Sequence, residues 1–201
     1  MKSSRTQADR TAATRGALTA AARPLFATKG YAAVGTDELA AAAGVTRGAL
    51  YHQFGGKEGL FVAVFEQVEA EVVDQIAGRL TGVEQSDPLT EALAAIDGWL
   101  EACADPEVHR IALIEAPAVL GWERWREIGQ RYGVGLVEAM VAGLVEAGVV
   151  AEQPVRPLAH LLVGALEEAA LYAARGEDRE VATAEARAAL ATLVAGLVRG
   201  T

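Results

Sequence analysis

The sequence of 201 residues has a single cysteine, six prolines and few aromatic residues, which make up 5% of the chain. One cysteine, Cys103, excludes an internal disulfide framework and any paired-cysteine metal or redox site, so a small buried apolar residue is expected there. β-Branched and aromatic residues are scarce while Ala, Leu and Glu are abundant, which favours an all-α fold. No segment alternates between apolar and polar residues for long enough to predict a sheet.

The chain also lacks targeting and membrane signals. Its first ten residues are polar and no apolar segment follows them, which argues against a secretory signal. Apolar runs are interrupted by Glu, Arg or Gly before they reach the length of a membrane-spanning helix. These absences predict a soluble, cytoplasmic protein that does not contact a membrane.

Enzyme motifs are absent as well. The sequence has no nucleophile elbow, zinc-protease motif, phosphate-binding loop or dinucleotide fingerprint. Its three histidines are scattered, and none stands three residues after a glutamate as in a ferritin-like di-metal bundle. We therefore expect no catalytic residue, no metal site and no cofactor.

Charge is unevenly distributed along the chain. The formal net charge is −9, yet residues 1–58 contain eight Lys and Arg against four Asp and Glu. The remaining residues contain ten basic side chains against 23 acidic ones. A basic head can bind phosphate and an acidic body is repelled by it, which orients the head toward DNA.

Apolar spacing and helix-end signals predict nine helices. Thr36, Thr46 and Asp87 are expected to cap helices at their first turns. Gly55 is expected to end the third helix and Pro117 to end or kink the sixth. The fourth helix is expected to join head and body without a flexible hinge. The predicted helices span about 9–29, 36–43, 47–53, 57–80, 88–103, 106–117, 122–147, 155–176 and 178–199.

The strongest local signal is TDELAAAAGVTRGALYHQFGGKEGL at residues 36–60, which predicts two short helices joined by a tight glycine turn. Small and apolar side chains such as Ala40 and Leu50 would hold both helices against the first one. This is helix-turn-helix geometry. The second of the two helices is expected to enter the major groove of DNA with its N-terminus first.

Exposed residues of this motif are assigned to DNA contact. Thr46 and the first N–H groups of its helix can hold a phosphate, and the Arg47 guanidinium can pair bidentately with guanine. Gly48 lets the backbone come close to the bases, while Tyr51 and His52 suit phosphate oxygens. The predicted DNA-binding residues are Thr36, Thr46, Arg47, Gly48, Ala49, Tyr51, His52 and Lys57.

The same segment resembles the DNA-binding domain of the TetR family of transcriptional regulators over about residues 11–65. Departures from the family pattern are Gly35, Ala42 and the pair Gly55-Gly56, which stands where Ser or Asn often caps the next helix. The matching residues are Phe26, Gly30, Thr36, Leu39, Ala40, Ala43, Gly44, Val45, Thr46, Gly48, Leu50, Tyr51, Phe54, Lys57, Glu58 and Leu60.

This resemblance implies two domains and a homodimer. The helix-turn-helix domain would comprise residues 1–56, and the ligand-binding and dimerisation domain residues 57–201. The last two helices of each subunit would form a four-helix interface. A pocket among the body helices would bind a ligand that changes the spacing of the two heads.

The last two helices carry broad apolar faces that need burial, and a dimer provides it. Packing within one subunit is the alternative. The predicted interface residues are Leu158, Leu162, Ala165, Leu166, Ala169, Leu190, Leu193, Val194 and Leu197.

Aromatic and polar residues of the body fit an apolar pocket with a few polar anchors. Ordinary core aromatics and surface charges are the alternative. His160 and Glu167 lie seven residues apart on one helix face and are expected to line one cavity. The predicted pocket residues are Trp99, His109, Trp122, Trp125, Tyr132, His160 and Glu167.

Together these features predict a transcriptional repressor that binds double-stranded, palindromic operator DNA as a homodimer. A small hydrophobic or amphipathic inducer would release it. A helical protein-interaction adaptor without specific DNA binding is the alternative, but it leaves the basic head and the helix-turn-helix spacing unexplained.

Overall fold

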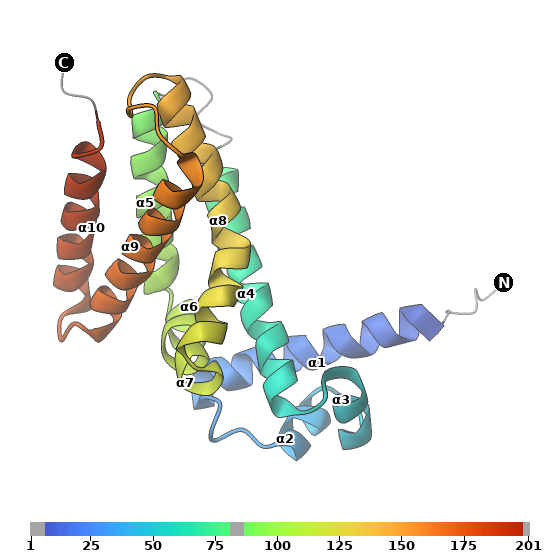
Figure 1. The fold of residues 1–201 in the computed structure, drawn as a ribbon. Coiled ribbons are helices and arrows are strands. Elements are labelled where there is room, and N and C mark those ends of the chain that lie inside the picture. The colour runs from blue at the N-terminus through green and yellow to red at the C-terminus, as the bar shows by residue number, and fades with distance from the viewer. Residues whose placement is uncertain (1–6, 81–86, 199–201) are drawn as a thin grey trace. The chain divides into compact units, whose positions relative to one another are not determined.

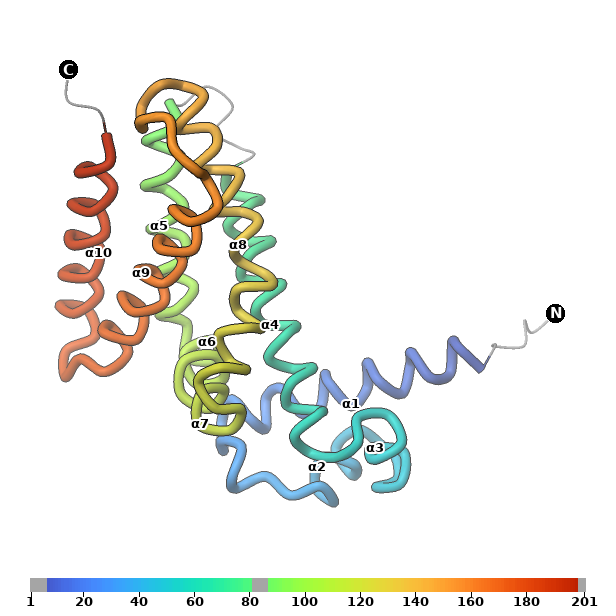
Figure 2. Tube along the Cα trace, in the orientation of Figure 1, coloured from blue at the N-terminus to red at the C-terminus, as the bar shows by residue number. Residues whose placement is uncertain are grey.

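The computed structural model describes residues 7–80 and 87–198. Within these residues every regular element is a helix, and an isolated antiparallel bridge joins Val150 to Val198. The predicted all-α class is confirmed (Figures 1 and 2). The elements are α1 (Gln7–Lys29), α2 (Thr36–Ala42), α3 (Arg47–Phe54), α4 (Lys57–Leu80), α5 (Pro88–Ala104), α6 (Pro106–Val108), η1 (His109–Glu115), α7 (Ala116–Leu120), α8 (Trp122–Glu146), α9 (Val155–Arg175) and α10 (Arg179–Ala195).

Two compact units make up the described chain. The first comprises the described residues through Val68 together with Pro106–Gly121, and the second comprises Glu69–Asp105 and the described residues from Trp122 onward. The helix α4 contributes residues to both units. This division follows packing, so the functional boundary expected after residue 56 stays a prediction.

Aromatic and aliphatic side chains form the core of the first unit. The rings of Phe26 and Tyr31 each lie 5.2 Å from the ring of Phe61 in edge-to-face geometry. Leu39 and Leu50 are fully buried, and they anchor α2 and α3. The apolar contacts that the sequence predicts for the two short helices therefore form.

Helix ends follow most of the predicted signals. Thr46 caps α3, since its hydroxyl accepts a hydrogen bond from the Ala49 N–H at 3.2 Å, and Asp87 caps α5 through the N–H groups of its first turn. Gly55 ends α3 in the left-handed conformation, with φ of 74°. The expected cap at Thr36 is wrong. Gly35 holds the cap position and Thr36 is already helical.

Of the two outcomes expected at Pro117, an end or a kink of the helix, the first is wrong. The chain stays helical through this residue, because a π-helical stretch, η1, precedes it and α7 starts at Ala116. Proline lacks the N–H that an ordinary helical turn would use, and its ring clashes with the preceding turn. Pro117 lies in the first turn of α7, where a backbone N–H has no partner within that helix, so its absence costs no hydrogen bond. The wider π-helical turn of η1 precedes α7. The predicted sixth helix is therefore three consecutive pieces.

The second unit is built from α5, α8, α9, α10 and the later part of α4. One core cluster contains buried residues of α5 and α10, and Trp99 packs against it. A second cluster forms around Ala92, Leu144 and Val150. No helix of the described residues is both long enough and apolar enough to cross a membrane.

Candidate DNA-binding surface and ligand site

Helix α3 presents most of the residues predicted to contact DNA. Leu50 is fully buried and fixes one side of the helix against the first unit's core. The opposite side is open to solvent, and Tyr51 is 45% exposed there. Thr46, Arg47, Gly48 and His52 are also exposed, whereas Thr36, Ala49 and Lys57 are partly buried.

Arg47 is held in place without being buried. Its guanidinium lies 3.6 Å from the Asp37 carboxylate and 5.5 Å from the centre of the Tyr51 ring. The Arg47 side chain is 57% exposed. An exposed ion pair at this distance contributes little stability, so the guanidinium can exchange Asp37 for a base or phosphate at small cost.

Lys57 is partly buried and contacts backbone carbonyls, and the phosphate contact expected of it stays a prediction. Its ammonium donates hydrogen bonds to the carbonyl oxygens of Tyr31 and Val34 at 2.7 and 2.8 Å. It also lies 4.0 Å from the centre of the Tyr31 ring. The loop after α1 leaves two backbone carbonyls without helical partners, and the start of α4 brings a cation to them.

Arg15, which the sequence interpretation did not single out, holds the end of α3 against α1. Its guanidinium donates to the Gln53 carbonyl at 2.5 Å and lies 4.2 Å from the centre of the Phe54 ring. The partners lie 38 residues apart in sequence. No local sequence pattern predicts such a pair, because only the packing of α1 on α3 brings Arg15 and Gln53 together.

The segment 106–121 also packs on the head, which the sequence did not predict. The Arg23 guanidinium pairs with the Glu107 carboxylate at 2.6 Å. At the end of α1, Gly30 has φ of 80°, and a Cβ placed there would collide with the ion pair between Arg110 and Glu115. A glycine is needed at this position for both its conformation and its lack of a side chain.

The predicted pocket residues belong to both compact units, and the pocket expected for them stays a prediction. His109 belongs to the first compact unit and the other six to the second. The Trp99 indole N–H donates to the Leu166 carbonyl at 3.1 Å. Trp125 is buried while Trp122 is 50% exposed, with their ring centres 4.9 Å apart.

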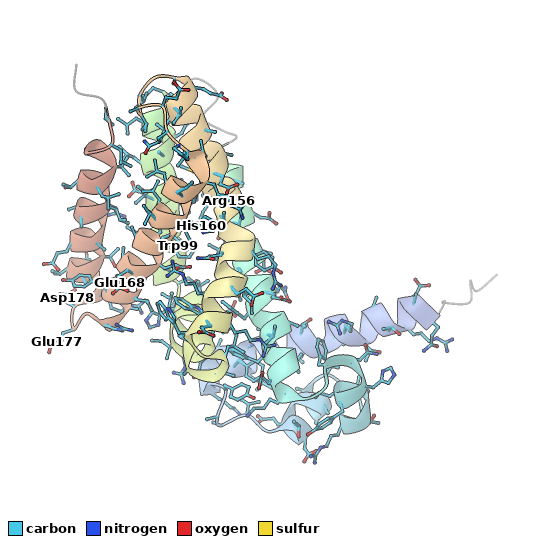
Figure 3. All side chains as sticks on the ribbon, viewed as in Figure 1. Trp99, Arg156, His160, Glu168, Glu177 and Asp178 are labelled. Carbon is cyan, nitrogen blue, oxygen red and sulfur yellow. The ribbon has the colours of Figure 1, made fainter. Side chains whose placement is uncertain are left out.

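Tyr132 and His160 are partly buried, on α8 and α9 respectively. His160 and Trp99 are among the labelled side chains in Figure 3. No hydrogen bond or ion pair in the described part of the chain joins His160 to Glu167. The shared cavity expected for that pair stays a prediction.

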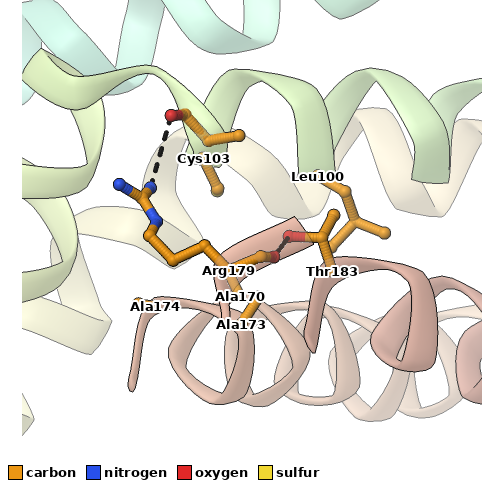
Figure 4. Close-up of a pocket in the computed structure, with 8 residues that line it drawn as sticks. Leu100, Cys103, Ala170, Ala173, Ala174, Arg179 and Thr183 are labelled. Atoms are coloured by element: carbon orange, nitrogen blue, oxygen red, sulfur yellow. Dashed lines mark hydrogen bonds between the residues drawn. The ribbon is translucent and has the colours of Figure 1, made fainter. Parts of the chain in front are cut away.

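A small hollow of the second unit lies among α5, α9 and α10 (Figure 4). Its cavity volume is about 10 Å³, close to the space that one water molecule needs. At its rim the Arg179 guanidinium donates to the Ala104 carbonyl at 3.3 Å. None of the seven predicted pocket residues lines it. The lining residues are Leu100, Cys103, Ala104, Ala170, Ala173, Ala174, Arg179 and Thr183.

Two buried acidic side chains, Glu69 and Glu167, lie in the second unit. They are 8% and 7% exposed, and they are the buried charged or polar residues among those the structure describes. Arg126 approaches Glu167 to 3.3 Å. Burial, together with the charge of Glu167, raises the pKa of Glu69 to about 7. Burial also raises the pKa of Glu167, against the lowering effect of Arg126.

The sequence interpretation found Glu167 but missed Glu69. A signal existed, since Glu69 follows Phe65 by one helical turn and precedes Val72 by three residues. Both neighbours belong to the apolar stripe of the fourth helix. A glutamate inside such a stripe is a candidate for burial.

The predicted interface residues divide into two groups. Leu190 and Val194 are buried inside the subunit, where they pack with Ile96 and Leu100 of α5. These two therefore fill the subunit's own core, which was the alternative to the dimer. Of the others, Leu193 is 44% exposed. The partly buried members of the set are Leu158, Leu162, Ala165, Leu166, Ala169 and Leu197.

Comparison with known proteins agrees with this architecture. Residues 18–64 match the bacterial regulatory proteins of the tetR family, and residues 89–197 match the tetracyclin repressor-like C-terminal domain. The Transposon Tn10 TetC protein of Escherichia coli is 30% identical over 156 residues, which is 78% of each chain. The HTH-type transcriptional regulator CymR of Pseudomonas putida is 36% identical over 89 residues, 44% of each chain.

A solved structure extends the similarity to the whole chain. It is a TetR-family transcriptional regulator from Pectobacterium atrosepticum, 38% identical, with a TM-score of 0.84. The match covers 98% of this chain and 99% of that one. The fold and the exposed α3 define a helix-turn-helix DNA-binding regulator. The chain belongs to the TetR family of transcriptional regulators.

Proposed function

We propose that this protein is a homodimeric repressor that a small hydrophobic or amphipathic ligand releases from a pseudo-palindromic operator. Each subunit would place its α3 in the major groove, with the two helices about 34–36 Å apart. The ligand would act by binding more tightly to the state whose heads are misplaced for DNA.

The observation that carries the proposal is the two-sided character of α3. Leu50 holds its inner side rigidly, and the Thr46 cap fixes its first turn. On the outer side, Arg47 and Tyr51 are exposed and in contact with each other. A rigid helix with an exposed guanidinium near its N-terminus suits base recognition in the major groove.

The operator experiment is fluorescence anisotropy of the full chain on its own upstream DNA, with a scrambled duplex at the same salt concentration. We expect tighter binding to the upstream duplex. The affinity should fall steeply as salt rises, because phosphate contacts release counterions. Equal, weak binding to both duplexes would contradict specific recognition at that site.

Replacing Arg47 with Ala is expected to weaken operator binding by about 1–3 kcal/mol and to relax the preference at one base pair. The loss arises because the guanidinium no longer pairs with guanine. Arg156→Ala is the matched control, since Arg156 is 81% exposed and lies in the second unit. Titration of single-base-pair variants of the operator measures the preference. If Arg47→Ala leaves it unchanged, Arg47 does not recognise a base.

Dimerisation is supported by apolar side chains that α9 and α10 leave in solvent. Leu161 is 72% exposed, Tyr172 52%, Val181 53% and Leu193 44%. Burial of such side chains between two subunits removes apolar surface from water.

Leu161→Glu is expected to convert the dimer into a monomer, because a carboxylate would be desolvated at the interface. Light scattering coupled to gel filtration measures the mass. Ile114→Glu introduces the same charge at a 41% exposed apolar residue of the first unit and should leave the dimer intact. A Leu161→Glu protein with the dimer mass would place the interface elsewhere.

A further inference from the structure

An acidic side chain, Asp37, lies beside the guanidinium proposed for base recognition. Asp37 is the second residue of α2, and its Oδ1 lies 3.6 Å from Nη1 of Arg47 at the start of α3. The Asp37 side chain is 80% exposed. The two charges therefore lie together in solvent, although they come from different helices of the helix-turn-helix.

The fold does not explain why an acid is present at this position. Within the described part of the chain, no hydrogen bond engages the Asp37 carboxylate. Its ion pair with Arg47 is long and exposed, so it contributes little stability. An acid in the first turn favours the dipole of α2, but Glu38 supplies one as well and also pairs with the Lys29 ammonium at 2.5 Å.

A carboxylate beside Arg47 opposes DNA binding in general, because the phosphate backbone is negatively charged. It stands out in residues 1–58, where eight Lys and Arg outnumber four Asp and Glu. Among the described residues, the cation within ion-pair distance of Asp37 is Arg47. Once that guanidinium pairs with a guanine, the carboxylate needs a hydrogen-bond donor from the DNA.

The edges of the bases differ in what they offer a carboxylate, which can only accept hydrogen bonds when it is ionised. In the major groove, guanine presents the acceptors N7 and O6, and thymine presents the acceptor O4 and a methyl group. Adenine places its N6 donor beside the acceptor N7, whereas cytosine presents the N4 amino group as a donor. Cytosine is therefore the base that suits a carboxylate best.

We propose that Asp37 is a specificity-determining residue that accepts a hydrogen bond from the N4 amino group of a cytosine. This cytosine would belong to the base pair next to the guanine that Arg47 contacts. Successive bases of a strand lie about 3.4 Å apart along the helix axis, which matches the 3.6 Å between the two charged groups. The assignment rests on the proposed placement of α3 in the major groove.

Selection of duplexes from a randomised pool by the full chain, followed by sequencing, tests the proposal. The unmodified protein should prefer guanine at one position and cytosine at the adjoining base pair. Asp37→Asn should relax the cytosine preference and keep the guanine preference, because an amide both donates and accepts hydrogen bonds.

Anisotropy titrations with duplexes that differ at the adjoining base pair measure the size of the effect. With the unmodified protein, the duplex with cytosine should bind at least about fivefold more tightly than the one with guanine at that position. With Asp37→Asn the two affinities should agree within about twofold. A purely structural role of Asp37 would lower the affinity for every duplex alike and leave this ratio unchanged.

Glu38→Gln is the matched control, since it removes the same charge from the next residue of α2 and leaves the pair of Asp37 and Arg47 in place. Its base preferences should equal those of the unmodified protein. The proposal is overturned if Asp37→Asn keeps the cytosine preference, or if Glu38→Gln loses it to the same extent. It is also overturned if Asp37→Asn loses the guanine preference instead, because Asp37 would then only position Arg47.

The same selections separate this inference from the proposed function. If the unmodified protein enriches no sequence, operator recognition fails and the role of Asp37 fails with it. If it enriches a sequence that Asp37→Asn enriches with equal preference at every base pair, only the role of Asp37 is overturned. Loss of the guanine preference in Arg47→Ala and of the adjoining cytosine preference in Asp37→Asn supports both.

Discussion

Replacing Glu69 with Gln is expected to raise the free energy of unfolding at pH 8 by about 3 kcal/mol. The pKa of Glu69 is about 7 in the folded protein against an ordinary value of 4.5. Each pKa unit corresponds to about 1.4 kcal/mol. The folded state holds this proton more tightly than the unfolded chain does. Stability is therefore lost as pH rises from about 4.5 to about 7 and stays low above that.

Denaturant unfolding of the unmodified protein and the variant at pH 5 and pH 8 measures this effect. Glutamine resembles the protonated acid in shape and cannot ionise, so the gain from Glu69→Gln should be much larger at pH 8 than at pH 5. Glu168→Gln, at an exposed position, should change stability little at either pH. A gain of equal size at both pH values would show that Glu69 does not titrate in this range.

Gly59→Ala is expected to destabilise the head by about 2 kcal/mol or more. A Cβ on Gly59 would overlap the carbonyl oxygen of Phe54, where α3 ends just before α4 begins. Overpacking costs about 1–3 kcal/mol and more where backbone must move. The helix propensity gained from alanine offsets at most about 1 kcal/mol. Because α3 must shift to make room, specific DNA affinity should fall as well.

Thermal unfolding and operator anisotropy measure the two losses. Gly16→Ala is the control, since Gly16 lies inside α1 and a Cβ there meets no atom within 4 Å. Alanine at that position should stabilise the protein by about 0.5–1 kcal/mol. If both variants stabilise the protein, α3 and α4 do not approach each other as closely as the structure shows.

Local chemistry explains the parts of the fold that were predicted. The Thr46 cap and the Gly55 stop act within one helical turn, so residues a few positions apart suffice to predict α3. Asp87 caps α5 for the same reason. Thr36 shows the limit of such signals. Gly35 and Thr36 are both acceptable cap residues, and only the path of the loop decides between them.

Contacts between distant segments could not be predicted. Lys57 has the charge and position of a phosphate contact in the sequence, yet two carbonyls more than twenty residues away hold its ammonium. Arg15 finds its partner across 38 residues. The sequence position of a charged side chain does not predict which partner it will contact, because that depends on how the helices pack.

The body shows the same limit more strongly. Apolar faces on the last two helices predict that they need burial, but not whether the subunit or a partner supplies it. Only packing shows that Leu190 and Val194 lie in the subunit's own core while Leu161 stays in solvent. Glu69 and Glu167 both lie near Gly129 because α4, α8 and α9, which are far apart in sequence, pack together.

The sequence by itself therefore determined the all-α class, the order of the helices and the helix-turn-helix head, and its motif indicated the family. These rest on periodicity, capping and turn chemistry, which act over a few residues. Only the tertiary structure decided which charges are structural, which apolar faces are left open and where carboxylates are buried. Burial and electrostatic pairing depend on everything that surrounds a side chain, and in this protein those surroundings come from helices distant along the chain.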